Sequence, residues 1–367
     1  MTRRTSVLIL LVLAVLLIGP ACVTTRTPAP ARAAAAVFPG AEWDRVPDPQ
    51  RAGWSSEGLA AVLEHVKTLP TTGFVVIAGG RVLLEYGDVA ELSYLASVRK
   101  SVLAMLYGNY VRSGKIRLNK SLAMLGITDH GGLTAQELEA TVADLLSARS
   151  GVYHPASNAG DNLADAPPRG SQKHGTYFLY SNWDFNALGT IFEKETGRNI
   201  YDALETDLAV PVGMQDFKRG AQMKSGDLTK SVHPAYHIWL STRDMARLGY
   251  LMLRRGKWAG KQLVPRDWVK RITRPVIHLP DMHPASMREG RVGYGYLWWV
   301  FDGPWARGPY KGAFTGMGAG GQYITVLPQL DLVVAHKTNL ERTARKSVSG
   351  RQYFELLDKL IAARLKR

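Results

Sequence analysis

The chain carries the stretch SVRKSVLAML at residues 97–106. It joins a hydroxyl and an amine, three residues apart, to an apolar run that is typical of a helix. Residues three apart lie on one face of a helix, so the amine of Lys100 can reach the oxygen of Ser97. An amine that burial keeps neutral could take the proton of this serine, which is otherwise a poor nucleophile.

A serine followed three residues later by a lysine is a weak signal by itself. Both residue types are common, and the plain alternative is a helix cap followed by a solvated lysine. No other serine in this chain has a lysine three residues downstream. The catalytic interpretation therefore needs further groups that act on the same serine.

A second candidate element, Tyr180-Ser181-Asn182, follows a long polar loop at residues 153–176. A tyrosine close to a lysine ammonium can have a lowered phenol pKa, and Tyr180 could then carry protons. The amide of Asn182 could hold the lysine and donate to a substrate carbonyl. The same three-residue pattern occurs at Tyr107, but there it lies on the Ser97 helix, where we expect a core residue. We therefore favour Tyr180.

A third candidate element is the glycine-rich run GMGAGGQ at residues 316–322, which opens a predicted strand toward Leu327. Glycines at a strand start indicate close approach of a ligand or another backbone. Free N–H groups there, with the N–H of Ser97, could form an oxyanion hole. The plain alternative is a flexible turn.

The composition predicts a globular protein with a large core, because the chain has 367 residues and 46% are hydrophobic. Its net charge is +15, but the basic residues are scattered and do not alternate with aromatic ones. We therefore expect a solvated basic surface and no nucleic-acid partner. The single cysteine, Cys22, excludes an internal disulfide.

The N-terminus is typical of an export signal. A basic pair, Arg3 and Arg4, precedes an apolar run at residues 7–18 that is too short to span a bilayer comfortably. Small residues before Cys22 resemble a bacterial lipoprotein processing site. We expect an exported bacterial protein, either periplasmic or anchored to a membrane through a lipid on Cys22. The alternatives are ordinary cleavage within residues 33–36 and an uncleaved membrane anchor.

These signals divide the chain into a signal peptide at residues 1–22, a flexible tether at 23–41 and one domain at 42–367. The domain pattern is a helix, a hairpin, a helical middle, several strands and a last helix. We therefore predict an α/β (α+β) fold, an antiparallel sheet built from both chain ends with the terminal helices on one face. A helical insertion at about 115–240 forms a second lobe.

The three elements together resemble the penicillin-recognising serine hydrolases. This family includes class C β-lactamases, D-alanyl-D-alanine carboxypeptidases, esterases and nylon-oligomer amidases. The resemblance implies that Ser97 is the acylated nucleophile and that Lys100 and Tyr180 form the proton network. It also implies that Asn182 positions the substrate. The N–H of Ala319, between Gly318 and Gly320, would complete the oxyanion hole.

One departure from the family pattern concerns the substrate. β-Lactamases and transpeptidases carry Lys-Thr-Gly or His-Thr-Gly where this chain has Gly316-Met317-Gly318, so the cation that recognises a substrate carboxylate is missing. This favours the esterase and amidase branch. We expect a serine hydrolase that cleaves a small ester or amide through an acyl-enzyme. A D-alanyl-D-alanine carboxypeptidase or β-lactamase, and a non-catalytic penicillin-binding-like sensor, are the alternatives.

No cofactor is expected, and the histidines do not predict a metal site. None of them has a convincing metal-ligand spacing. The four considered are His154, His174, His233 and His237.

Overall fold

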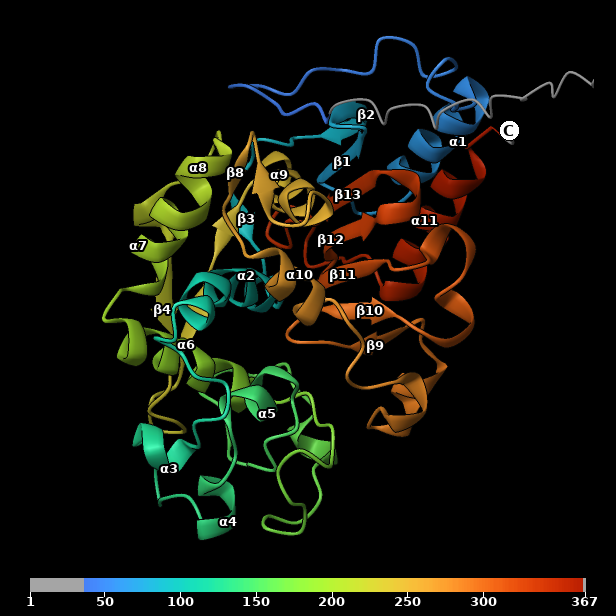
Figure 1. The fold of residues 1–367 in the computed structure, drawn as a ribbon. Coiled ribbons are helices and arrows are strands. Elements are labelled where there is room, and N and C mark those ends of the chain that lie inside the picture. The colour runs from blue at the N-terminus through green and yellow to red at the C-terminus, as the bar shows by residue number, and fades with distance from the viewer. Residues whose placement is uncertain (1–35, 366–367) are drawn as a thin grey trace, which may run out of the picture. The chain divides into compact units, whose positions relative to one another are not determined.

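A seven-stranded antiparallel sheet forms the centre of the protein in the computed structural model, which describes residues 36–365 (Figure 1). Its strand order is β2-β1-β13-β12-β11-β10-β9. The strands are β1 (Gly73–Ala78), β2 (Arg81–Gly87), β9 (Val292–Tyr294), β10 (Trp299–Phe301), β11 (Phe314–Gly318), β12 (Gln322–Leu327) and β13 (Leu332–Lys337). The early hairpin pairs with the last strand, so the predicted sheet built from both chain ends is confirmed.

Three two-stranded ribbons accompany this sheet. They pair β3 (Ser93–Tyr94) with β6 (Trp239–Leu240), β4 (Met223–Ser225) with β5 (Ala235–His237), and β7 (Lys257–Trp258) with β8 (Lys261–Gln262). The helices are α1 (Ser56–Lys67), α2 (Val98–Arg112), α3 (Leu122–Leu125), α4 (Ala135–Leu138), α5 (Val142–Leu146), α6 (Asn182–Thr196), α7 (Ile200–Leu204), α8 (Val210–Val212), α9 (Thr242–Leu253), α10 (Arg266–Ile272) and α11 (Gly350–Ala362).

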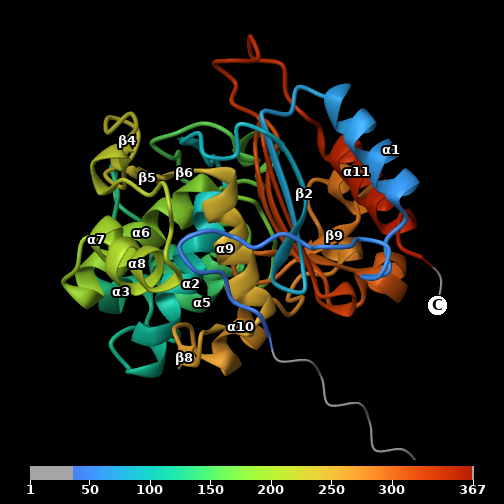
Figure 2. The ribbon, with the colours of Figure 1, turned by 90° about the horizontal axis from the view of Figure 1, so that it is seen from above.

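Helices cover both faces of the sheet. The terminal helices α1 and α11 pack together on one face, as the sequence predicts, and their apolar residues share one core cluster (Figure 2). Helices α2 and α9 pack on the other face. Gly249 lets α9 come close, because a Cβ there would lie 2.5 Å from Cγ1 of Val333. Helices α3 to α8 belong to the segment between α2 and α9, where the sequence predicts an insertion.

The first described residues lie against α9. The hydroxyl of Tyr250 donates to the carbonyl of Val37 at 2.6 Å, and Arg247 donates to the carbonyls of Gly40 and Ala41. The last part of the predicted tether therefore contacts the domain. The predicted signal peptide, Cys22 and most of the tether lie outside the described residues. Within residues 36–365, no helix is long and apolar enough to cross a membrane.

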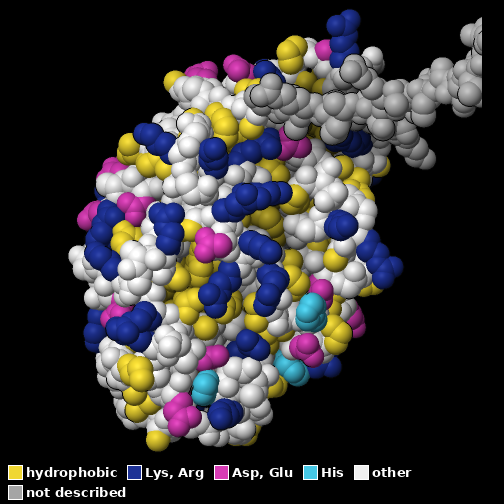
Figure 3. Space-filling view, in the orientation of Figure 1, with side chains coloured by type: hydrophobic (Ala, Val, Ile, Leu, Met, Phe, Trp, Pro, Cys, Tyr) yellow, Lys and Arg dark blue, Asp and Glu magenta, His cyan; other side chains and the backbone are white. Residues whose placement is uncertain are grey.

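Lys and Arg side chains are numerous on the face of the molecule that carries α10. Figure 3 shows them gathered near the middle of this face, in the orientation of Figure 1. Acidic side chains are fewer there and more scattered. The distribution of positive charge is therefore not as even in space as it is along the sequence.

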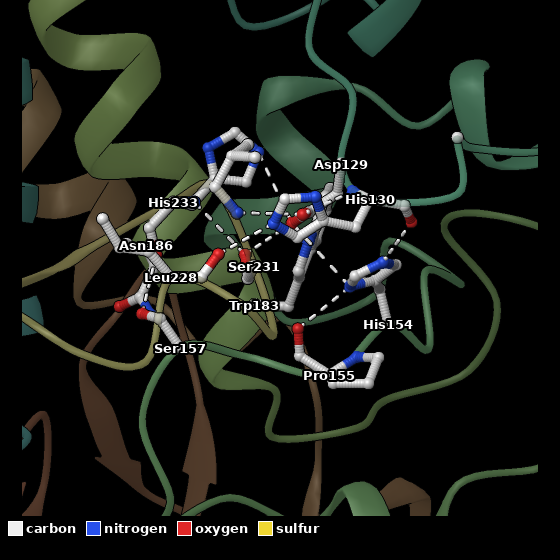
Figure 4. A network of polar contacts seen from close by, with 12 residues as sticks. Asp129, His130, His154, Pro155, Ser157, Trp183, Asn186, Leu228, Ser231 and His233 are labelled. Atoms are coloured by element: carbon white, nitrogen blue, oxygen red, sulfur yellow. Dashed lines mark hydrogen bonds and ion pairs between the residues drawn. The ribbon is translucent and has the colours of Figure 1, made fainter.

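The buried carboxylate of Asp129 connects separate parts of the helical segment through hydrogen bonds (Figure 4). Its Oδ1 accepts from the backbone N–H groups of His130 at 2.7 Å and Val232 at 2.9 Å. Its Oδ2 accepts from the indole N–H of Trp183 at 2.7 Å and from the hydroxyl of Ser231. Trp183 is the second residue of α6, so this network fixes the start of that helix.

The network predicts that Asp129→Asn lowers the free energy of unfolding by about 3 kcal/mol at pH 7, because a charged acceptor of four hydrogen bonds is lost. Burial alone would raise the pKa of Asp129, but hydrogen bonds from Ser231, Val232, His130 and Trp183 outweigh it and keep this pKa below its ordinary value. A carboxyl group whose pKa is lower in the folded than in the unfolded state stabilises the folded protein. This stabilisation is complete at pH values above the pKa of the unfolded state, and it is lost as the pH falls through the pKa of the folded state.

Urea unfolding at pH 7 and at pH 3 would measure this effect, with exposed Asp44→Asn as the matched control. We expect the difference between wild type and Asp129→Asn to shrink at pH 3, and the control to match wild type at both. An equal difference at both pH values would contradict the role given to the charge.

Candidate active site

Ser97 lies at the start of α2, after a strained turn. The preceding residue, Ala96, has a φ of +47°, in the left-handed region that residues with a side chain seldom adopt. Ser97 occupies the cap position of the helix, but its side chain makes no capping hydrogen bond. Its Oγ lies 3.0 Å from Nζ of Lys100. The hydroxyl of Ser97 therefore contacts the lysine amine and does not cap the helix.

The amine of Lys100 has three close polar neighbours. Besides Ser97, Nζ lies 2.8 Å from the phenol oxygen of Tyr180 and 2.7 Å from Oδ1 of Asn182. A neutral amine has two hydrogens and one lone pair. It can donate to Tyr180 and Asn182 and accept the hydrogen of the Ser97 hydroxyl. These three contacts therefore match the form of lysine that can act as a base.

Burial sets the charge of Lys100, which is only 2% exposed. Burial is the largest cause that lowers its pKa well below the ordinary value, and repulsion from the neighbouring cation of Arg99 adds to it. The carboxylate of Asp161 opposes both effects. The structure therefore favours a neutral amine beside Ser97.

The phenol of Tyr180 behaves differently from the expectation drawn from the sequence. Burial raises its pKa, and this outweighs the opposite effects of the hydrogen bond with Ser97 and of the charge on Arg99. A lowered pKa needs an ammonium beside the phenol, whereas burial favours the neutral form of Lys100. The expectation of a lowered pKa is therefore wrong, and Tyr180 is a neutral phenol that can both donate and accept.

Contacts from distant parts of the chain position Tyr180 and Asn182. The ring of Tyr180 stacks on Trp299 of β10, with ring centroids 5.3 Å apart. The backbone N–H of Asn182 donates to Asp161 at 2.9 Å, and its side-chain amide donates to the carbonyl of Ala159 at 3.0 Å. Trp299 and Asp161 were not singled out from the sequence as site residues, because no local motif marks them.

Arg99 is a buried cation next to the site. It is 1% exposed, its Nη2 donates to Oδ1 of Asn186 at 2.9 Å, and its guanidinium lies 4.3 Å from the ring centre of Tyr236. Within residues 36–365 it forms no ion pair, and its Nη1 has no hydrogen-bond partner. No ion pair therefore neutralises its charge, which lowers the pKa of Lys100 against the opposite effect of Asp161.

The end of β11 lies directly against the start of α2. A Cβ on Gly318 would lie 3.1 Å from the backbone nitrogen of Ser97 and 2.5 Å from the carbonyl oxygen of Leu95, so only glycine fits. Among the described residues, the N–H groups of Ser97 and Ala319 donate to no protein acceptor. Gly320 follows with a φ of +85° and completes the turn. Two unused donors thus lie near the nucleophile, as an oxyanion hole requires.

Two pockets meet at Ala319. The smaller one, about 350 Å³, contains the nucleophile. It is lined by Ser97, Gly160, Tyr180, Trp299, Met317, Gly318, Ala319, Gly320, Tyr323, Ser347, Val348, Ser349 and Gly350. The larger one, about 570 Å³, is bounded by Ala96 and Ala319 and does not include Ser97. We take the smaller pocket as the reaction site, because it holds the reactive hydroxyl, and the larger one as adjoining space.

No cation lines the smaller pocket among the described residues. At Gly316 a Cβ would lie 3.1 Å from Oγ of Ser101 and 3.4 Å from Val98, so β11 leaves little space there for a side chain. Met317 contributes an apolar side chain to the pocket. The missing charge noted in the sequence is therefore also missing from this pocket.

The histidines considered as metal ligands lie in separate places. His174 contacts Asp144, and His237 contacts Tyr94. His154 and His233 both approach Asp129, at 3.7 and 4.0 Å, but four donors already occupy that carboxylate (Figure 4). Within residues 36–365 no group of three or more potential ligands is arranged to hold a metal ion.

Comparisons with known proteins show the family of this chain. The sequence model of the Beta-lactamase family matches residues 59–358. An uncharacterized protein of Alkalihalophilus pseudofirmus is 33% identical over 108 residues, which cover 28% of this chain and only 30% of that protein. The 6-aminohexanoate-dimer hydrolase of Paenarthrobacter ureafaciens is 24% identical over 318 residues, covering 78% of this chain and 77% of the relative.

Solved structures share the fold at low sequence identity. A candidate 6-aminohexanoate-dimer hydrolase from Bacillus anthracis has a TM-score of 0.64 and 17% identity, covering 88% of this chain and 86% of that one. A family VIII carboxylesterase has a TM-score of 0.60 and 15% identity, covering 88% and 99%. The predicted fold class is thus confirmed. Because the family model covers most of its length, this chain belongs to the Beta-lactamase family and is a serine hydrolase.

Proposed function

We propose that this protein hydrolyses small uncharged esters, and more slowly amides, through an acyl-enzyme on Ser97. One observation carries the proposal: the buried amine of Lys100 contacts Ser97, Tyr180 and Asn182 at the same time. A protein that only binds a ligand has no need of this proton network. The arrangement therefore weighs against the non-catalytic sensor.

Acylation uses the neutral amine as the base. Oγ of Ser97 attacks the substrate carbonyl carbon while its proton moves to Nζ of Lys100. The N–H groups of Ser97 and Ala319 stabilise the oxyanion of the tetrahedral intermediate. Lys100 then returns the proton, through the hydroxyl of Tyr180, to the oxygen or nitrogen that leaves. The bond to the leaving group breaks, and the acyl group stays on Oγ.

Deacylation repeats these steps with water. A water molecule takes the place of the leaving group and gives a proton, through Tyr180, to the neutral Lys100. The resulting hydroxide attacks the acyl carbon, and the proton on Lys100 then returns to Oγ of Ser97 as the free acid departs. Since Tyr180 keeps its own proton overall, its raised pKa is compatible with a relay role.

The pocket supports an uncharged substrate. Its lining holds aromatic, aliphatic, glycine and serine residues and no charged side chain. β-Lactams and D-alanyl peptides carry a carboxylate, which would lose hydration in this pocket without gaining a cation. Relatives named as a carboxylesterase and as 6-aminohexanoate-dimer hydrolases agree with ester or amide cleavage. The 6-aminohexanoate dimer itself ends in a carboxylate, so the argument for an uncharged substrate rests on the pocket of this chain and not on these relatives. The alternative of a carboxypeptidase or β-lactamase is therefore less well supported.

We also propose that the protein is exported and attached to a membrane through a lipid on Cys22. The proposal is supported by the basic start, the short apolar run at residues 7–18 and the small residues before the only cysteine. A lipid anchor would keep the hydrolase near the cell envelope.

A substrate panel would test the proposed chemistry. We expect turnover of p-nitrophenyl esters first, then short amides, with poor turnover of nitrocefin and D-alanyl peptides. Ser97→Ala should lower ester turnover at least about a thousandfold and abolish labelling by a fluorophosphonate probe. Ser101→Ala is the matched control, one turn along α2, because its hydroxyl donates only to the carbonyl of Leu297. Labelling of the Ser97→Ala variant would refute the assignment, and preferred turnover of nitrocefin would refute the substrate class.

The cation of Arg99 predicts a shift in the pH profile of kcat/KM. The active form of Lys100 is the neutral amine, so activity is lost, tenfold per pH unit, as the pH falls below its pKa. Arg99→Gln removes a repulsive charge and makes the ammonium of Lys100 more stable. We therefore expect the acidic limb of the profile to move to higher pH.

Two variants of Asn186 separate charge from packing. Asn186→Asp places a carboxylate beside Arg99 and should move the limb in the same direction as Arg99→Gln. Asn186→Ala removes the hydrogen bond to Arg99 but keeps its charge, so the limb should stay where it is in wild type. A limb that is unmoved in both charge-changing variants would show that Arg99 does not tune Lys100.

Detergent phase separation of bacterial extracts would test the lipid anchor. We expect wild type in the detergent phase and Cys22→Ala in the aqueous phase or accumulating unprocessed, because the attachment atom is lost. Serine-hydrolase labelling at Ser97 would follow the protein in both phases. Wild type in the aqueous phase, or both proteins mature and in the detergent phase, would contradict a lipid on Cys22.

A further inference from the structure

Ten exposed basic residues gather around β7, β8, α10 and the end of α2, and we call this area the basic face. Its members are Arg112, Lys115, Arg117, Arg255, Lys257, Lys261, Arg266, Lys270, Arg271 and Arg274. The stretch from Arg255 to Arg274 contains one acidic residue, Asp267. Figure 3 shows the concentration of Lys and Arg side chains in this region of the molecule.

Tertiary packing brings the two parts of the basic face together. The indole N–H of Trp268 on α10 donates to the carbonyl of Ala104 on α2 at 2.7 Å. The side chain of Asn109 donates to the carbonyl of Leu263, just before α10, at 2.7 Å. Arg112 at the end of α2, and the turn that follows it, therefore adjoin the basic surface of α10. Segments about 140 residues apart in the sequence thus form one charged area.

No member of the basic face forms an ion pair with another described residue. Ion pairs do occur elsewhere in the described chain, for example between Arg243 and Asp216 and between Arg291 and Asp358. Like charges placed close together repel each other unless anions or salt screen them. A dense area of unpaired positive charge is therefore suited to an extended anionic partner.

The surroundings favour a membrane surface over a nucleic acid. The tryptophans of this region, Trp258 and Trp268, are buried, so the basic face offers no exposed indole on which bases could stack. The described chain begins beside it, where Phe38 packs edge-on against Trp258 with ring centroids 5.4 Å apart. Upstream in the sequence lie a basic pair and the apolar run at residues 7–18.

We propose that the basic face docks on anionic phospholipid headgroups. Lysine and arginine side chains near an anionic bilayer are each attracted to it, and the attraction falls off within a Debye length. In Figure 2, α10 and β8 lie at one edge of the molecule and the loop between β13 and α11 lies at the opposite edge. That loop lines both pockets. A docked protein would therefore hold its pockets away from the lipid, open to substrates in solution.

Vesicle sedimentation of the full chain tests the proposal. The probes are phosphatidylglycerol vesicles and neutral phosphatidylcholine vesicles, so any binding by the apolar run that does not depend on charge appears with both. The face variant is Lys257→Glu, Lys261→Glu and Arg266→Glu. The matched control, Arg307→Glu, Lys311→Glu and Arg351→Glu, makes the same change in net charge on exposed residues outside the basic face.

We expect wild type and the control to bind the anionic vesicles at least tenfold more tightly than the neutral ones, with the difference lost in 0.5 M salt. Each attraction lost near such a surface weakens binding about fivefold, and each glutamate adds repulsion, so the face variant should lose the whole preference for anionic vesicles, a loss of at least tenfold. Ester turnover should be equal in all three proteins, which shows that they fold.

Three results would overturn the proposal. The face variant could bind anionic vesicles as wild type does, or the control could lose as much binding as the face variant. In the third result, wild type binds the vesicles weakly and binds a 20-base-pair DNA duplex tightly, and the face variant does not bind the duplex. This result would assign the basic face to nucleic acid. Since turnover is measured separately, failure of the docking proposal leaves the proposed hydrolase function intact.

Discussion

The burial of one amine governs the chemistry of this protein. Lys100 lies on α2 inside the core, where an ammonium would lose its hydration and would find no carboxylate in direct contact among the described residues. The amine therefore favours its neutral form, which has the lone pair that Ser97 needs. The neighbouring groups complete this arrangement, since Tyr180 and Asn182 accept the two remaining hydrogens.

The chemistry also requires that the backbone of the sheet comes close to Ser97. Strand β11 meets α2 with glycines at 316 and 318, so its backbone comes near the nitrogen of Ser97 and its end leaves the N–H of Ala319 unused. The same approach leaves little room for a lysine at position 316. The close approach that favours an oxyanion hole thus also leaves little space for the cation that would recognise an anionic substrate.

Positive charge has two different roles in this fold. Inside, Arg99 is a buried cation whose field reaches Lys100, and burial makes this field strong because little solvent screens it. Outside, the basic face carries charges that solvent screens individually, so only their number and closeness give them an effect. Ser97 lies at the start of α2 and Arg112 of the basic face lies at its end, so one helix connects the site with the edge of the basic face.

The sequence by itself determined the features that depend on local spacing. The period of a helix places Ser97 and Lys100 one turn apart, and the order of apolar runs predicts an antiparallel sheet from both chain ends, with terminal helices on one face. The preference for Tyr180 over Tyr107 agrees with the structure, where the hydroxyl of Tyr107 donates to the carbonyl of Leu188 in the core. Only the tertiary structure decided the pKa direction of Tyr180, the influence of Arg99 and the assembly of the basic face. These depend on burial and on contacts between segments far apart in the chain, and neither follows from the spacing of neighbouring residues.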